Sequence, residues 1–158
     1  MDPKEALWRQ SLSHAGILRF RPLGCSMAPI LCNGDIVTIE ARADMRVGDI
    51  MLADHGGGLV LHRVVARRNG RLITKGDSLD HLDAPVTREQ ILGRAVARER
   101  QGRRSSLVSY GARFCGLCFS LTFPWVDRFF PPGVTVLKRL FRGGLLSEPE
   151  YASISGQD

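Results

Sequence analysis

The sequence has no hydrophobic run that would cross a bilayer without interruption. Residues 4–19 mix apolar with charged side chains and are far too polar to span a membrane. Residues 107–123 are long enough, but Arg113 near their middle would cost about 2.5–3.5 kcal/mol on insertion scales, and Pro124 should close the segment early. We therefore expect no N-terminal transmembrane anchor and no secretory signal peptide, hence a cytoplasmic or peripherally membrane-associated protein.

Cysteine is scarce as well, with four in 158 residues. Cys25, Cys32, Cys115 and Cys118 form no recognisable disulfide framework, so we expect reduced thiols in a cytoplasm-facing protein. The spacing of Cys115 and Cys118 is that of half a zinc or redox site, but no second pair at metal-ligand spacing completes it. We interpret these two as small apolar residues on a helix face and expect neither metal nor organic cofactor.

Aromatic residues make up only 7% of the chain, whereas basic residues are in excess and give a net charge of +6. The arginines and lysines form short groups: Arg63/Arg67/Arg68, Arg98/Arg100/Arg103/Arg104 and Lys138/Arg139/Arg142. A basic surface suits either nucleic acid or an anionic membrane. Because no aromatic residues alternate with these groups in a stacking pattern, we rank the membrane first and expect no nucleic-acid partner.

The chain contains several short β-favouring runs, which are separated by Gly, Asn and Asp residues typical of turns. They cover residues 36–40, 49–53, 59–65, 71–74 and 91–97. Asn69-Gly70 between two of them is the strongest hairpin signal. The pattern predicts a mainly β fold, a compact antiparallel β domain with a short N-terminal helix and a C-terminal helical appendage.

Four segments follow from this pattern. They are a short N-terminal helical segment at 1–19, a catalytic β domain at 20–98, a basic amphipathic helical tail at 99–143 and a polar, flexible C-terminus at 144–158. The tail would begin with a basic linker at 98–104.

Residues 107–123 have two different faces when they are drawn as a helix. One face is apolar and carries Leu107, Tyr110, Phe114, Leu117, Cys118 and Leu121, and the other carries Ser109, Arg113, Gly116 and Ser120. The stretch 134–141 again sets apolar against basic residues. Residues 105–143 could lie on a membrane surface or pack on the β domain as a helical hairpin, and the sequence leaves both open.

Three residues could carry nucleophilic chemistry. Ser26 lies in the turn Gly24-Cys25-Ser26-Met27-Ala28-Pro29, where glycine and proline can expose a hydroxyl. His62 lies in a strongly β-favouring run, and Asp77 follows the next run. In a small β domain the three could converge, with His62 taking the Ser26 proton and Asp77 orienting the imidazole. Spacing alone does not prove that convergence, since a single histidine in a strand is more often structural.

Five ordered boxes resemble type I signal peptidases of the S24/S26 kind. They are Gly24-x-Ser26-Met27-x-Pro29-x-Leu31-x-x-Gly34-Asp35, Gly48-Asp49-Ile50, His62-Arg63-Val64, Thr74-Lys75-Gly76-Asp77 with Asp83, and Ile91-Leu92-Gly93-Arg94-Ala95-Val96. The resemblance covers residues 22–98. Within that superfamily, bacterial signal peptidases and self-cleaving repressors use a lysine base. The endoplasmic-reticulum and archaeal branch carries histidine in the third box, and this chain is similar to that branch.

The resemblance implies roles for particular residues. It makes Ser26 the nucleophile, His62 the base and Asp77 the favoured third member, while Asp83 matches a second family acid and leaves the choice of triad acid open. Lys75 would be structural or a surface charge. Gly24 replaces a serine that helps to hold the oxyanion in many bacterial members, so backbone N–H groups would carry that task.

The function implied is a serine endopeptidase that cuts an extended signal-like or leader-like segment after small residues, without a cofactor. Its partner would be a peptide or protein substrate, with a possible membrane surface bound through residues 105–143. A dedicated leader-processing or regulatory peptidase is the second enzymatic hypothesis, because we expect no N-terminal anchor. A non-catalytic peptide- or membrane-binding module on the same fold is the alternative from another class.

Overall fold

A computed structural model describes residues 3–42, 44–56 and 58–129 of the chain. Its elements in order are α1 (Pro3–Ala15), β1 (Ile17–Phe20), β2 (Ile36–Glu40), β3 (Ile50–Asp54), β4 (Leu59–Arg68), β5 (Arg71–Lys75), the short 3-10 helix η1 (Arg88–Gln90), β6 (Ile91–Arg100), β7 (Arg103–Ser106) and α2 (Tyr110–Phe129). The expected mainly antiparallel β fold with a helix at each end is confirmed.

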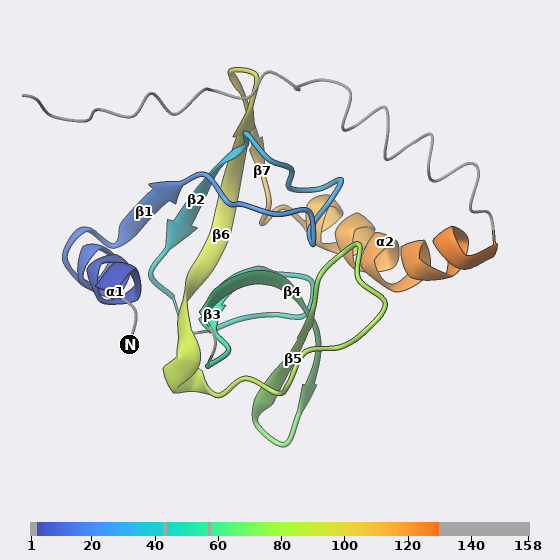
Figure 1. Ribbon diagram of the computed structural model, residues 1–158, viewed down its shortest axis with the longest axis horizontal. Coiled ribbons are helices and arrows are strands. Elements are labelled where there is room, and N and C mark those ends of the chain that lie inside the picture. Colours follow the sequence, from blue (N-terminus) through green and yellow to red (C-terminus); the bar gives the residue numbers. More distant parts are fainter. Residues whose placement is uncertain (1–2, 43, 57, 130–158) are drawn as a thin grey trace, which may run out of the picture.

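The seven strands form one antiparallel sheet in the order β1-β2-β6-β3-β4-β5, with β7 added to β6 (Figure 1). The long strand β6 organises it, because β2, β3 and β7 all pair with it. At Gly93 a Cβ would lie 2.5 Å from the carbonyl oxygen of Glu40, so only glycine lets β6 approach β2 this closely. Register shifts in three of the strand pairs bend the sheet around its core.

Two apolar clusters fill the sheet. The larger one includes Val37, Ile39, Ile50 and Leu52, all at most 1% exposed, and α1 covers it through Leu12. The smaller cluster lies beneath β3, β4 and β5. Alternating inward side chains from short antiparallel strands produce such a core, which is what the β-favouring runs predicted.

Two boundaries in the C-terminal third differ from the sequence-based expectation. Residues 98–104 are not a linker: β6 continues to Arg100 and turns at Gln101 and Gly102, both with positive φ, into β7. Helix α2 does not close at Pro124 but continues to Phe129. The missing N–H of a proline inside a helix leaves the carbonyl four residues earlier unpaired. Here that carbonyl, on Ser120, accepts a hydrogen bond from Lys75 Nζ at 2.6 Å instead.

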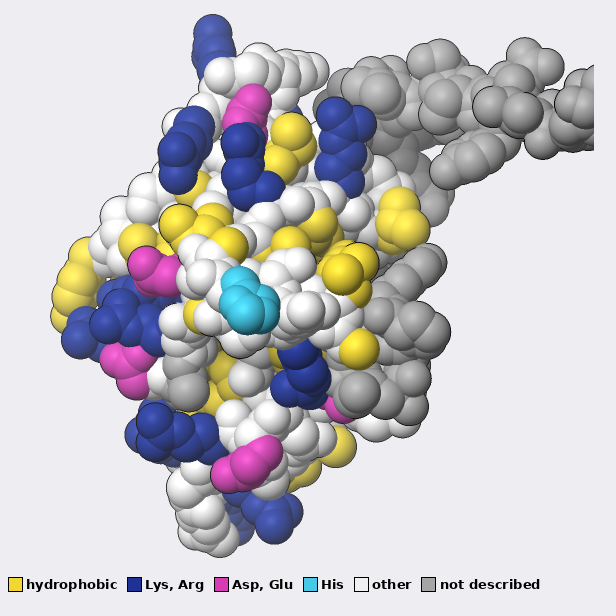
Figure 2. Space-filling view, turned by 90° about the vertical axis from the view of Figure 1, so that its left-hand side faces the viewer, with side chains coloured by type: hydrophobic (Ala, Val, Ile, Leu, Met, Phe, Trp, Pro, Cys, Tyr) yellow, Lys and Arg dark blue, Asp and Glu magenta, His cyan; other side chains and the backbone are white. Residues whose placement is uncertain are grey.

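The helices lie on opposite sides of the sheet (Figure 1). No helix in the described ranges is both long enough and apolar enough to cross a membrane. Figure 2 shows the face on the left-hand side of Figure 1, where Lys and Arg side chains are scattered among acidic and apolar ones. Basic side chains therefore do not gather into one patch on that face.

Candidate active site

The turn between β1 and β2 carries Ser26. Gly24 has a φ of +100°, and its N–H donates to Asn33 Oδ1 at 3.0 Å. Met27 and Leu31 are 4% and 2% exposed and fix the turn to the core, whereas Ser26 is only half-buried. The turn thus presents a hydroxyl at the surface while its neighbours are buried, as a nucleophile requires.

Ionic contacts hold this turn against β6. Asp35 is 1% exposed, and its carboxylate accepts hydrogen bonds from Arg100 Nε and a terminal nitrogen of the same guanidinium, both at 2.7 Å, and from the N–H of Cys32 at 2.8 Å. The guanidinium of Arg98 donates to the carbonyl of Ile30. Burial would raise the pKa of Asp35, but these hydrogen bonds outweigh it and lower the pKa below its ordinary value.

The loop after β5 contacts the Ser26 turn from the other side. The N–H of Ser78 donates to the carbonyl of Ser26 at 2.9 Å, and its hydroxyl donates to the carbonyl of Cys25 at 2.7 Å. Gly76 passes so close that a Cβ there would lie 2.8 Å from the Ser26 carbonyl oxygen. Within the part of the chain that the structure describes, the hydroxyl and N–H of Ser26 have no hydrogen-bond partner.

His62 is paired with Asp83. Nδ1 of His62, 6% exposed in the middle of β4, lies 2.7 Å from Asp83 Oδ2, and Thr74 Oγ1 donates to the same oxygen at 2.7 Å. Burial raises the pKa of Asp83, but the hydrogen bonds from Thr74 and His62 outweigh it and leave the pKa below its ordinary value. An ionised carboxylate only accepts, so Nδ1 carries a proton, and in the neutral ring Nε2 is then the nitrogen that can accept one.

Asp77, favoured from the sequence as the partner of His62, is bound elsewhere. Its two oxygens accept hydrogen bonds from Arg63 at 2.8 and 2.7 Å, in a pair whose side chains are 0% and 1% exposed. Arg63 also donates to the carbonyl of Gly48 at 2.8 Å. A fully buried guanidinium demands such a fork of acceptors, and Asp77 supplies it. The structure therefore brings His62 together with Asp83 and not with Asp77.

A hollow of about 330 Å³ lies beside the Ser26 turn and β4. Ser26 and His62 both line it, with Leu23, Met27, Leu59 and Leu79 among the apolar walls. β4 pairs with β3 along Leu59 to Arg63, whereas its pairing with β5 begins only at Arg63. Among the described strands, the second edge of β4 over residues 59–62 is therefore open beside the hollow.

The other candidate residues lie outside the hollow or take no part in its polar contacts. Lys75 is 5% exposed and donates to the carbonyls of Gly76 and Ser120, and burial lowers its pKa against the opposing charges of Asp77, Asp80 and Asp83. It does not line the hollow. Asp80 is exposed and pairs with His81 at 3.1 Å. Burial raises the pKa of the Cys32 thiol in the hollow wall.

Sequence reasoning missed the supporting residues Thr74, Ser78 and Arg100, because their roles depend on contacts between distant segments. Thr74 lay within a recognised box, and that was the one signal that could have drawn attention to it. The described residues contain no group of three or more His, Cys, Asp or Glu side chains that could hold a metal ion.

Two comparisons with known proteins bear on this geometry. A family model described as Peptidase S24-like matches residues 7–96, which is more than half of the chain. The match contains Ser26, His62, Asp77 and Asp83 and ends before β7 and α2. No curated protein matches the chain.

Proposed function

Since the chain belongs to the S24-like peptidase family, we propose that it is a serine endopeptidase in which Ser26 is the nucleophile, His62 the general base and Asp83 the residue that orients the base. One observation carries this proposal: His62 is held through Nδ1 by a carboxylate 2.7 Å away and shares one hollow with Ser26.

The chemistry follows from this arrangement. Ser26 Oγ attacks the scissile carbonyl carbon while its proton passes to Nε2 of His62, and Asp83 stabilises the imidazolium that forms. The N–H of Ser26 is a donor for the oxyanion. The imidazolium then protonates the leaving amine as the C–N bond breaks. Water, deprotonated by His62, releases the other fragment from the acyl-enzyme.

The open edge of β4 supports an extended substrate. A peptide lying along residues 59–62 would form main-chain hydrogen bonds as an added strand and would bring its scissile bond to Ser26. The resemblance to histidine-using signal peptidases supports a signal-like or leader-like segment with small residues before the scissile bond. Lys75 is a poor alternative base, because the carbonyls of Gly76 and Ser120 hold its ammonium group away from the hollow.

The test is cleavage of a peptide library with small residues at the positions before the scissile bond. Ser26→Ala and His62→Ala should each lower kcat/KM by at least about 10³-fold, because each removes one member of a unit that acts together. Cys25→Ala is the matched control, since Cys25 is exposed beside Ser26 and should be dispensable. Folded wild-type protein that cleaves nothing, with or without lipid, would favour the non-catalytic binding module.

A further inference from the structure

Helix α2 presents large apolar side chains to solvent. Tyr110, Phe114 and Leu121 are 88%, 66% and 50% exposed, and their spacing places them on one side of the helix, which we call the α2 outer face. Cys118 on the same side is also exposed. Scattered single exposed apolar residues are ordinary, but a row along three turns of one helix is a feature that needs an explanation.

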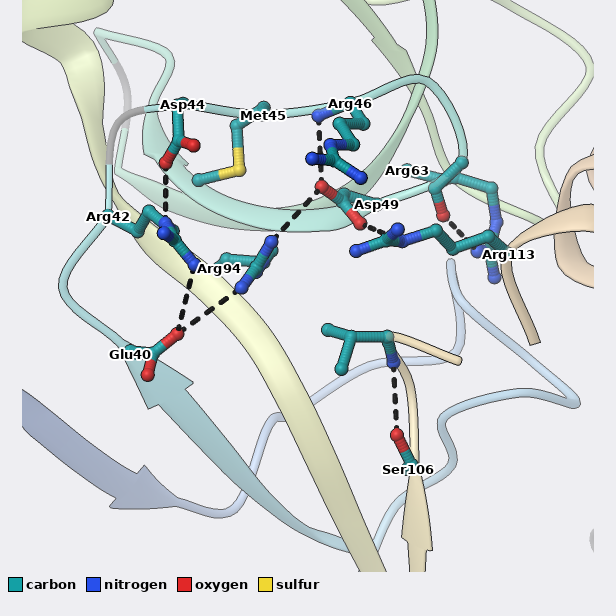
Figure 3. Close-up of polar contacts among 12 residues, drawn as sticks. Glu40, Arg42, Asp44, Met45, Arg46, Asp49, Arg63, Arg94, Ser106 and Arg113 are labelled. Atoms are coloured by element: carbon teal, nitrogen blue, oxygen red, sulfur yellow. Dashed lines mark hydrogen bonds and ion pairs between the residues drawn. The ribbon is translucent and has the colours of Figure 1, made fainter. Parts of the chain in front are cut away.

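The side of α2 that contacts the sheet instead carries a charged residue, a glycine and a serine. Arg113 Nε donates to Asp49 Oδ1 at 2.6 Å (Figure 3), and a Cβ on Gly116 would lie 2.6 Å from the guanidinium of Arg63. Ser120 is 0% exposed, and its carbonyl accepts from Lys75. These contacts fix the rotation of the helix about its axis. The outer face therefore cannot turn inward without breaking them.

The net charge of the protein is concentrated, along the sequence, in the segment that contains α2. Residues 103–142 contain seven arginines and lysines and one aspartate, a net charge of +6 that equals the net charge of the whole chain. The rest of the chain is balanced. Among the described residues, Arg103 and Arg104 are exposed on β7, just before α2 begins.

Aromatic residues are concentrated in the same region. Seven of the eleven aromatic residues in the sequence lie between positions 110 and 130. Helices that lie in the plane of a membrane combine a row of aromatic and aliphatic side chains with flanking Lys and Arg. Each basic residue close to an anionic leaflet strengthens that attraction.

We propose that the α2 outer face, together with Arg103 and Arg104 just before α2, binds in the plane of an anionic lipid surface. A second copy of the chain is a poorer occupant, because pairing two outer faces would bring the exposed Arg103 and Arg104 of two copies together. Nucleic acid is a poorer occupant too: Tyr110 and Phe114 can stack on bases, but Cys118 and Leu121 on the same face offer neither stacking nor hydrogen bonds. The proposal does not depend on peptidase activity.

The test is flotation of the full chain with vesicles of phosphatidylcholine alone or with about one third phosphatidylglycerol. Wild type should bind the anionic vesicles and not the neutral ones. Tyr110→Ser/Phe114→Ser should weaken binding about tenfold or more, because it removes the apolar contact. The matched control Leu7→Ser/Ile17→Ser, which changes two residues that are 60% and 54% exposed on the other side of the sheet, should bind as wild type does.

Charge is tested with a second matched pair. Arg103→Gln/Arg104→Gln should weaken binding to anionic vesicles about tenfold, whereas Arg68→Gln/Arg71→Gln, at the exposed tip of the β4–β5 hairpin, should leave it nearly unchanged. Ser26→Ala should bind as wild type does, which separates this proposal from the catalytic one. The proposal is overturned if wild type ignores anionic vesicles, if Tyr110→Ser/Phe114→Ser binds normally, or if the α2 outer face instead mediates self-association in sedimentation velocity.

Discussion

His62 and Arg63 are neighbours in β4, and their side chains reach two different aspartates. Successive residues of a strand point to opposite faces of the sheet, so His62 and Arg63 point to opposite sides of the sheet. Asp83 is hydrogen-bonded to His62 and Asp77 to Arg63, although both aspartates belong to the same loop after β5. One loop thus binds His62 through Asp83 and the buried Arg63 through Asp77.

Substituting the two aspartates in turn should separate these roles. Asp83→Asn should lower kcat by about 10²–10⁴-fold, because the amide no longer holds the Nδ1–H tautomer of His62, and should reduce the free energy of unfolding less than Asp77→Asn does. Asp77→Asn should lower the free energy of unfolding by about 3 kcal/mol or more, because Arg63 would keep a buried charge without its counterion. Urea unfolding and peptide cleavage would be measured on both variants. Equal effects of the two substitutions on kcat at conditions where both are folded would contradict this division.

The sequence was sufficient to identify Ser26, His62 and the two aspartates as candidates, but it could not assign the aspartates. Asp77 and Asp83 are six residues apart in a loop, where no periodicity fixes the direction of a side chain. The choice depends on Arg63, whose buried guanidinium binds Asp77 in a bidentate manner and leaves His62 to Asp83. Spacing along the sequence does not show which aspartate Arg63 binds, so it cannot predict which one remains for His62.

Helix α2 is fixed to the sheet at successive turns. Arg113 binds Asp49, Gly116 lies against Arg63, and the Ser120 carbonyl, which Pro124 cannot pair, accepts from Lys75. Gly116 is the tightest of these contacts, and the guanidinium it meets is held by Asp77 and the Gly48 carbonyl. The arginine therefore has little freedom to move away from a larger side chain.

Gly116→Ala and Gly111→Ala form a matched pair on this helix. A Cβ at Gly111 meets nothing within 4 Å, so that variant should be as stable as wild type or slightly more stable. Gly116→Ala should lower the free energy of unfolding by about 1–3 kcal/mol, because the added methyl group overpacks against Arg63. It should also speed acetylation of Lys75, which mass spectrometry separates from the two other lysines of the chain. The same acetylation rate in both variants would argue against the described docking of α2.

Amphipathicity predicted a helix in this region but not which side of it would be covered. The usual rule places the apolar side inward. Here the small and polar side docks, because Asp49, Arg63 and Lys75 are buried groups of the sheet that need partners, and Arg113, Gly116 and Ser120 suit them. The rotation of α2 about its axis is therefore set by buried charged residues that lie far from α2 in the sequence. An analysis of the helical segment alone does not include them.

Buried carboxylates connect the parts of the whole molecule. Asp35 ties the Ser26 turn to β6, Asp77 holds β4 to the loop after β5, and Asp49 joins β3 to β6 and α2. Asp49 lies between Arg94 and Arg113 and also accepts from the N–H of Arg46 (Figure 3). Removing any of these carboxylates takes a counterion from a buried or half-buried arginine, so the three ion pairs should stabilise the fold together.

Acidification should therefore destabilise the protein in a definite pH range. The pKa of Asp35 in the folded chain lies below its ordinary value of 3.8, so its stabilising effect is complete above about pH 4 and is lost as the pH falls further. Asp35→Asn should lower the free energy of unfolding by about 1–3 kcal/mol at pH 6. Between pH 4 and about 2.5 the free energy of unfolding of this variant should fall less than that of wild type. Urea unfolding at each pH measures this.

Asp80→Asn, which alters an exposed ion pair, is the control and should follow wild type throughout. Parallel pH profiles of wild type and Asp35→Asn would show that the Asp35–Arg100 pair does not tie the Ser26 turn to β6 in solution.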